Sequence, residues 1–178
     1  MDVDRDQLER GRRAARERHL APRVEFLEAD ASRCDRTADR VLCLGASHAW
    51  GGTEEALRGL RQTLSPGGRC LFGEGFWSRP PSREARELFG ALSPSLSDLV
   101  KVATTWGWRA VYSDVASLEE WDAFETEYRH GLEEFARAHP EDPLAVAAGA
   151  RAEARRTEYE VVYRGTLGFA YLVLERVP

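Results

Sequence analysis

The chain has 178 residues and a net charge of -5 at pH 7, with 30 acidic side chains against 25 lysines and arginines. This acidic balance argues against a general nucleic-acid binder. The charged start lacks the apolar stretch of a signal peptide, and no apolar run approaches the length of a membrane span. We therefore expect one globular domain over 1–178 that does not depend on a membrane.

The three cysteines include no CxxC pair and no spacing typical of a metal site. Cys43 and Cys70 fall within apolar runs and are predicted to be small buried residues. Free thiols of this kind fit a reducing compartment, so we expect a cytoplasmic protein without a bound metal.

The first elements are a surface helix and a strand. Residues 5–19 predict the helix, because arginines alternate there with acids around a narrow apolar stripe. Residues 23–30 predict the strand, with Val24 and Phe26 on one face. Asp30 stands at its end, where an acidic residue is often only a turn former or a helix cap.

Residues 38–77 predict a strand, a turn, a helix and a second strand. The apolar run Val41–Leu44 suits a strand buried on both faces. Thr53 is the expected N-cap of the helix, and Ser65–Gly68 ends it. Two parallel strands joined by a helix belong to an α/β sheet, in which ligands lie beyond the carboxyl ends of the strands. That edge would hold two segments, 45–48 and 74–77.

The second half of the chain begins with residues 78–106, which look like a lid-like helical insert. Ser117 and Glu120 then form a capping box that opens a helix with aromatic residues at helical spacing. The elements expected are, in order, helices over 84–89 and 95–105, a strand over 107–113, helices over 117–135 and 144–159, and a strand over 168–177.

This order of elements resembles the class I S-adenosylmethionine-dependent methyltransferases of the small-molecule kind. Four motifs carry the resemblance: Asp2–Leu8, Glu28-Ala-Asp-Ala31, the segment 38–48 that ends in Gly-Ala-Ser-His, and Leu64-Ser-Pro-Gly-Gly-Arg69. The resemblance implies a Rossmann-like α/β sheet with flanking helices and an antiparallel C-terminal strand. The remaining strands would be ordered as the family's third, fourth, fifth, seventh and sixth.

The resemblance also implies a cofactor, S-adenosyl-L-methionine, and the residues that bind it. Asp2 would bind the ribose hydroxyls, and Asp30 with Ala31 would meet the adenine. Gly45 and Ala46 form the turn that would face the methyl group.

Methyl transfer needs two reactants held in line with water excluded, and a positioned base helps where the acceptor carries a proton. His48 is the candidate catalytic base; alternatively its ring caps a helix or packs beside a tryptophan. The residues expected to face a small-molecule substrate are Trp50, Glu74, Trp77 and Tyr128. Core packing is the alternative for the three aromatic residues, and a loop start is the alternative for Glu74.

The sequence departs from the family in one motif, because the GxGxG turn after the first strand occurs nowhere in it. By the resemblance, the chain begins inside the fold and is N-terminally truncated, through a miscalled start or a shortened gene. The DNA upstream would distinguish these. A catalytically inactive remnant that serves as a binding or interaction domain is the alternative function. A nicotinamide-dependent enzyme would need GxGxxG, which is also absent.

Overall fold

The computed structural model describes residues 1–177, which form two compact units. Unit 1 comprises Met1–Phe72, Ala103–Val111 and the chain from Val173 on, and unit 2 comprises Gly73–Val102 and Tyr112–Leu172. A four-stranded sheet runs in the order β1-β2-β4-β3. Its strands are β1 (Ala38–Leu44), β2 (Leu64–Trp77), β3 (Trp108–Val115) and β4 (Leu167–Arg176).

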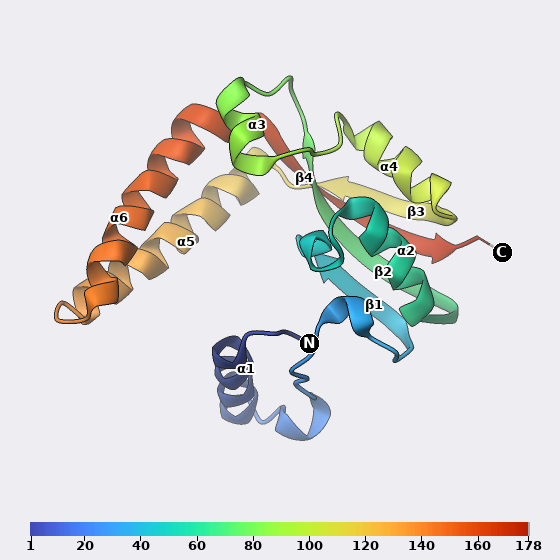
Figure 1. Ribbon diagram of the computed structural model, residues 1–178, viewed down its shortest axis with the longest axis horizontal. Coiled ribbons are helices and arrows are strands. Elements are labelled where there is room, and N and C mark those ends of the chain that lie inside the picture. The colour runs from blue at the N-terminus through green and yellow to red at the C-terminus, as the bar shows by residue number, and fades with distance from the viewer. Residues whose placement is uncertain (178) are drawn as a thin grey trace. The chain divides into compact units, whose positions relative to one another are not determined.

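The strand β4 runs opposite to the other three strands (Figure 1). The Rossmann-like α/β class, the order of these four strands and the antiparallel C-terminal strand are thus confirmed. None of the helices formed by residues 1–177 combines the length and the hydropathy of a bilayer-spanning segment.

In unit 1, β1 is followed by helix α2 (Thr53–Thr63), which packs its leucines into the core. Leu57 and Leu60 are 0% and 2% exposed. The helix begins at Thr53 as expected, but its N-cap is Gly52, so the predicted N-cap is wrong. Gly51 and Gly52 have φ of 93° and 145°, a backbone that a side chain would strain, and this sharp turn sets where the helix begins.

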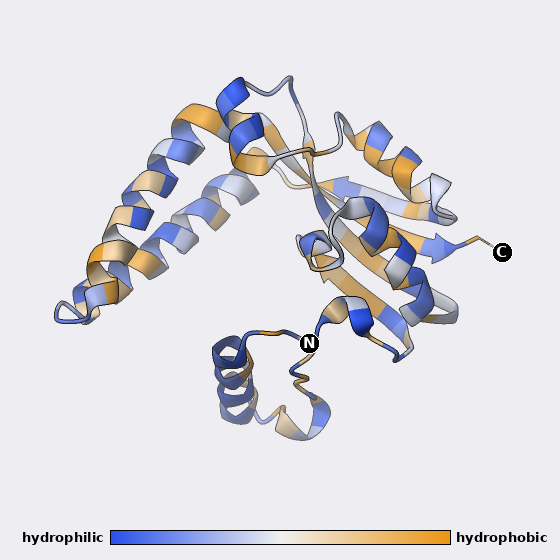
Figure 2. Ribbon diagram, in the orientation of Figure 1, coloured by the Kyte–Doolittle hydropathy of each residue, from blue (hydrophilic) through white to orange (hydrophobic). Residues whose placement is uncertain are grey.

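Strand β1 begins with the charged Asp39 and Arg40 and is apolar over its second half (Figure 2), yet only one face of that apolar half is covered. Cys43 is buried, as predicted, whereas Leu42 is 67% exposed. The predicted burial of both faces is therefore wrong. Side chains alternate between the two faces of a strand, and the Leu42 face of β1 is left open in the described structure.

Segments far apart in the sequence close unit 1. Arg61 of α2 donates hydrogen bonds to the carbonyl of Gly107 and, at 3.2 Å, to that of Val177. The indole Nε1 of the buried Trp108 donates to the Leu57 carbonyl at 2.9 Å. Glu175 pairs with Arg69 and Arg109 at 2.8 and 2.7 Å. Residues 173–177 are thus built into the same unit as residues 1–72.

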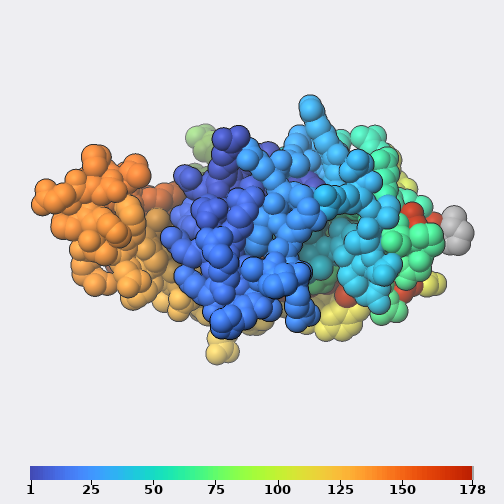
Figure 3. Space-filling view, turned by 90° about the horizontal axis from the view of Figure 1, so that it is seen from below, coloured from blue at the N-terminus to red at the C-terminus, as the bar shows by residue number. Residues whose placement is uncertain are grey.

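The predicted strand over 23–30 is wrong. The segment contains a 3-10 turn, Ala21–Arg23, and otherwise extended chain. Within residues 1–177 the strand pairing of this segment is limited to one isolated parallel bridge, between Asp2 and Glu28. A single bridge is too little pairing to form a strand. Phe26 instead lies against Gly11 of helix α1 (Arg5–Glu17), and the two segments form one continuous surface, in dark to mid blue in Figure 3.

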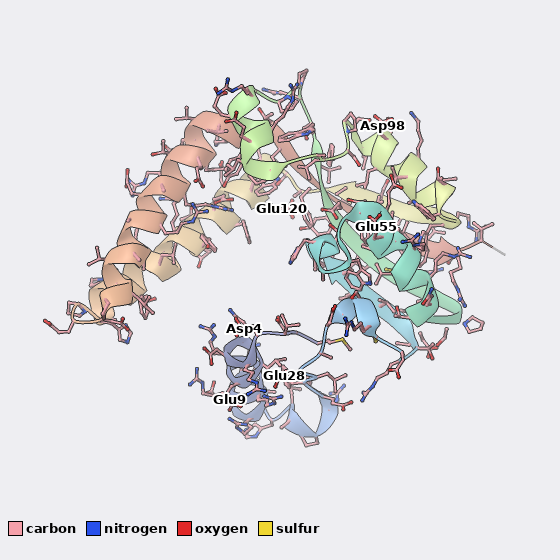
Figure 4. The ribbon with its side chains drawn as sticks, in the orientation of Figure 1. Asp4, Glu9, Glu28, Glu55, Asp98 and Glu120 are labelled. Carbon is pink, nitrogen blue, oxygen red and sulfur yellow. The ribbon has the colours of Figure 1, made fainter. Side chains whose placement is uncertain are left out.

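Helix α1 starts where two side chains fix its first turn. Asp4 is its N-cap and accepts hydrogen bonds from the amides of Asp6 and Gln7 at 2.8 and 3.1 Å. Arg5 then pairs with Glu28 at 2.6 Å, and Figure 4 labels Asp4 and Glu28 on the two segments. These contacts hold the start of the chain beside residues 27–29.

Unit 2 contains most of the remaining helices. The capping box of Ser117 and Glu120 is present at the start of α5, as predicted. A cluster of buried residues joins the end of β2 to the C-terminal part of the chain; its members are Trp77, Ala85, Tyr159, Tyr163 and Leu167. The helices are α3 (Arg83–Phe89), α4 (Leu96–Thr105), α5 (Leu118–Ala138), α6 (Pro143–Thr157) and a π-helical turn (Glu158–Tyr163).

Candidate functional site

The turn after β1 is held by its own backbone. Gly45 has a φ of 62°, and a 3-10 helix, Ser47–Trp50, follows it. The amides of Gly51 and Gly52 donate to the carbonyls of His48 and Ser47 at 3.0 and 3.2 Å. The turn therefore presents Gly45 and Ala46 at the carboxyl end of a strand, where α/β sheets bind ligands.

The residues predicted to bind the cofactor come together in unit 1. Asp2 donates its amide to Leu27 at 3.1 Å and accepts from the amide of Ala29 at 3.0 Å, so it lies close to Asp30 in space. The 3-10 turn Ala31–Arg33 lies with Cα atoms within 8 Å of the turn Ser47–Trp50. Three segments distant in the sequence thus meet beside β1.

Asp30 acts as the cap of the turn Ala31–Arg33. Its Oδ1 accepts hydrogen bonds from the hydroxyl and the amide of Ser32 at 2.7 and 2.9 Å. These two bonds, in that order, hold the pKa of the Asp30 carboxyl below its usual value, with a smaller contribution from Arg33. Since 43% of the side chain stays exposed, the carboxylate is ionised and able to accept further hydrogen bonds.

Asp2 and His48 are both exposed. The Oδ1 of Asp2 accepts from the Asp4 amide at 2.9 Å, which orients the side chain at the start of α1. No hydrogen bond or ion pair among residues 1–177 engages the His48 ring. Trp50 is half-buried, and its ring lies against Gly59 of α2.

The other residues predicted to face the substrate belong to unit 2. Glu74 is 7% exposed, and its Oε1 accepts from the Gly75 amide at 3.0 Å. Trp77 is 6% exposed and packs edge-on against Phe89, with 6.3 Å between ring centroids. Tyr128 is 42% exposed on α5. Trp77 is thus largely buried, with one edge left at the surface, whereas Tyr128 lies at a surface.

Sequence reasoning missed the most buried acid of the protein. Glu125 of α5 is fully buried and accepts two hydrogen bonds from Arg155, both at 2.7 Å. The hydroxyl of Tyr163 donates to it at 2.8 Å. Burial, and then this bond, raise the pKa of Tyr163 above its usual value. The Arg155 guanidinium also covers the Tyr128 ring at 5.0 Å.

A second acid lies one helical turn earlier on α5. Asp122 accepts from the hydroxyl of Tyr159 at 2.6 Å and from two nitrogens of Arg164 at 2.8 and 2.7 Å. The Arg164 hydrogen bond, followed by that of Tyr159, lowers the pKa of Asp122 to about 2. The spacing of three residues between Asp122 and Glu125 was the only sequence signal that they share a helix face.

Comparisons with known proteins agree with this architecture. Residues 1–72 match the family described as a methyltransferase domain. An uncharacterized protein of Escherichia coli (strain K12), YjhP, is 29% identical over 170 residues, which cover 92% of this chain and 68% of that protein. The X-ray structure of YjhP superposes with a TM-score of 0.82 at 26% identity, over 98% of this chain and 74% of the other.

Two further crystal structures are similar and contain a ligand. A SAM-dependent methyltransferase from Geobacter sulfurreducens, in complex with S-adenosyl-L-homocysteine, has a TM-score of 0.78 at 28% identity, over 95% of this chain and 71% of that chain. A SAM-dependent methyltransferase from Thiobacillus denitrificans, in complex with the same ligand, has a TM-score of 0.82 at 27% identity, over 98% of this chain and 73% of that chain.

Proposed function

We propose that this chain, which belongs to the class I S-adenosylmethionine-dependent methyltransferase family, binds S-adenosyl-L-methionine and transfers its methyl group to a small-molecule acceptor. The observation that carries this proposal is the meeting of Asp2, the Asp30 turn and the Gly45–His48 turn in unit 1. The S-adenosyl-L-homocysteine in the two similar crystal structures supports it, because that ligand is the demethylated form of the same cofactor.

The residues in these turns fit the adenosine part of the cofactor by their chemistry. A carboxylate accepts hydrogen bonds, so Asp2 suits ribose hydroxyls and Asp30 suits an adenine amino group. The Ala31 amide is the first of its turn, where no intrahelical acceptor exists, and it suits an adenine ring nitrogen. Gly45 adds a backbone that a ligand can approach closely. We assign no residue to the methionine end.

When bound, S-adenosyl-L-methionine supplies an electrophilic methyl group on a sulfonium sulfur. The protein's work is then to hold the acceptor in line with that methyl group and to exclude water. His48 lies on the turn beside the proposed adenosine contacts, and a nitrogen of its ring would take the proton that an acceptor hydroxyl or amine releases. Glu74, Trp77 and Tyr128 are the proposed substrate-facing residues of unit 2, and Trp50 is that of unit 1.

Isothermal titration with S-adenosyl-L-homocysteine tests the proposal. We expect a micromolar dissociation constant, weakened about tenfold by Asp30→Asn, because a hydrogen bond to a charged group is lost. Asparagine caps a helical turn as well as aspartate does, so the turn itself is retained. Asp35→Asn, an exposed change nearby, is the matched control and leaves the constant unchanged. No heat at millimolar ligand, in a protein shown to be folded by circular dichroism, would overturn the proposal.

A further inference from the structure

Unit 2 contains a cavity, open to solvent, of about 730 Å³ between the end of β2 and the loops on both sides of α3. This volume is typical of sites for small organic ligands. Its walls are largely apolar and include Trp77, Pro80, Pro81 and Leu92. Proline and tryptophan lose little conformational freedom on binding, so the walls suit a rigid apolar ligand.

Backbone contacts fix the floor of the cavity. The amide of Trp77 donates to the Ser93 carbonyl at 2.9 Å, next to a parallel bridge between Phe76 and Ser93. The Ser78 amide donates to Thr166 at 2.9 Å. These backbone bonds hold the segment after β2 beside Ser93 and Thr166.

Two arginines line this apolar cavity, Arg79 from the loop and Arg86 from α3. The part of the chain that the structure describes gives neither guanidinium an ion-pair partner, and none of the lining residues is acidic. Arg83, one turn before Arg86, is different because it pairs with Glu87 at 3.0 Å and lies outside the lining. Free guanidinium groups beside apolar walls suit a carboxylate, which they bind through paired N–H donors.

We propose that this cavity binds an apolar carboxylic acid. Its apolar body lies against Trp77, Pro80 and Leu92, and its carboxylate meets Arg79 and Arg86. This binding does not rest on the proposed function. A phosphate ester is the less favoured anion, because a dianion is costlier to place beside apolar walls.

Calorimetric titration of the full chain with 1-naphthoate, 1-naphthalenemethanol and inorganic phosphate tests the assignment. We expect naphthoate to bind at least tenfold more tightly than the neutral alcohol, and phosphate to give no signal. Arg79→Gln and Arg86→Gln each weaken naphthoate about tenfold and leave the alcohol unchanged. Arg83→Gln, on the same helix, is the matched control and changes neither. Ala91→Trp, which fills the cavity from its wall, abolishes binding of both aromatic probes.

Equal affinity for acid and alcohol, or naphthoate binding that survives both arginine changes, would overturn the assignment. Phosphate binding without naphthoate binding would also overturn it. The same samples are titrated with S-adenosyl-L-homocysteine, so the two proposals fail separately. Naphthoate binding without S-adenosyl-L-homocysteine binding would overturn only the methyltransferase proposal. S-adenosyl-L-homocysteine binding without naphthoate binding would overturn only the carboxylate proposal.

Discussion

Glu125 is an acid with no exposed surface, and its position depends on two other side chains. Arg155 donates two hydrogen bonds to it and Tyr163 donates a third, so its oxygens are satisfied inside the protein. A buried carboxylate without such partners would carry a penalty of several kcal/mol. Each of these groups therefore depends on the others, although they lie 30 and 38 positions apart in the chain.

Replacing Glu125 by alanine should leave the partly buried Arg155 guanidinium without its anion. We expect Glu125→Ala to lower the free energy of unfolding by about 3–5 kcal/mol, the usual loss when one partner of a buried pair is removed. Urea unfolding followed by circular dichroism measures this change. Glu127→Ala, an exposed acid on the same helix, should stay within about 0.5 kcal/mol of the wild type. Equal losses in the two variants would contradict the account.

At the scale of elements, Asp122 joins α5 to the π-helical turn Glu158–Tyr163 through Tyr159 and to the residue after it through Arg164. The pKa of its carboxyl falls from 3.8 to about 2 in the folded protein. A folded-state pKa below the unfolded one stabilises the protein above the unfolded value, and that stabilisation is lost as the pH falls through the folded value.

The stability difference between wild type and Asp122→Asn should therefore be constant above about pH 5 and shrink between roughly pH 4 and pH 2. Urea unfolding at a series of pH values measures it. A difference that is the same at pH 5 and at pH 2 would show that Asp122 does not titrate through these contacts.

The exposed face of β1 has a different consequence. An edge strand has unpaired backbone groups that another chain can extend, and the exposed Leu42 adds apolar surface to that edge. We expect Leu42→Lys to reduce self-association without loss of stability, as measured by sedimentation velocity at increasing protein concentration. Val146→Lys makes the same change at a residue of α6 that is 78% exposed and should have no effect. If the Leu42→Lys variant self-associates as strongly as the wild type, the edge of β1 does not mediate self-association.

Some of these elements could be predicted from the sequence and others could not. The leucines of α2 and the Ser117–Glu120 box were found because their signals lie within a few residues of each other. The strand predicted over residues 23–30 does not form, because an alternating pattern alone does not supply a partner strand. The aromatic stripe of α5 is only partly buried, with Phe124 56% exposed, while Glu125 takes the buried position. Burial there is decided by partners that are remote in the sequence.

The whole molecule is made of two units that share the strands β2, β3 and β4. Unit 1 uses three stretches of the chain and unit 2 uses two, so the backbone passes between them four times. When one unit unfolds, its part of each shared strand loses its hydrogen bonds to the neighbouring strands. The hydrogen bonds that the same strand makes in the other unit are then weakened too. We therefore expect one cooperative unfolding transition.

Calorimetry tests that expectation, because the calorimetric and van't Hoff enthalpies coincide for a single transition. Near-ultraviolet and far-ultraviolet circular dichroism should also show the same midpoint. Two separable transitions, or two midpoints from the two probes, would mean that each unit unfolds alone.

The contacts of Arg61, Arg69 and Arg109 with residues after position 172 also bear on biosynthesis. Most of unit 1 is synthesised before unit 2, but the strand segment that closes it is synthesised after unit 2. Residues 1–72 therefore remain incompletely packed until residues 173–177 have left the ribosome. Nascent chains arrested before residue 172 should be cut by protease within α2, and those arrested well beyond the last residue should resist. The first half of this protein is thus an expected client for chaperones during its own synthesis.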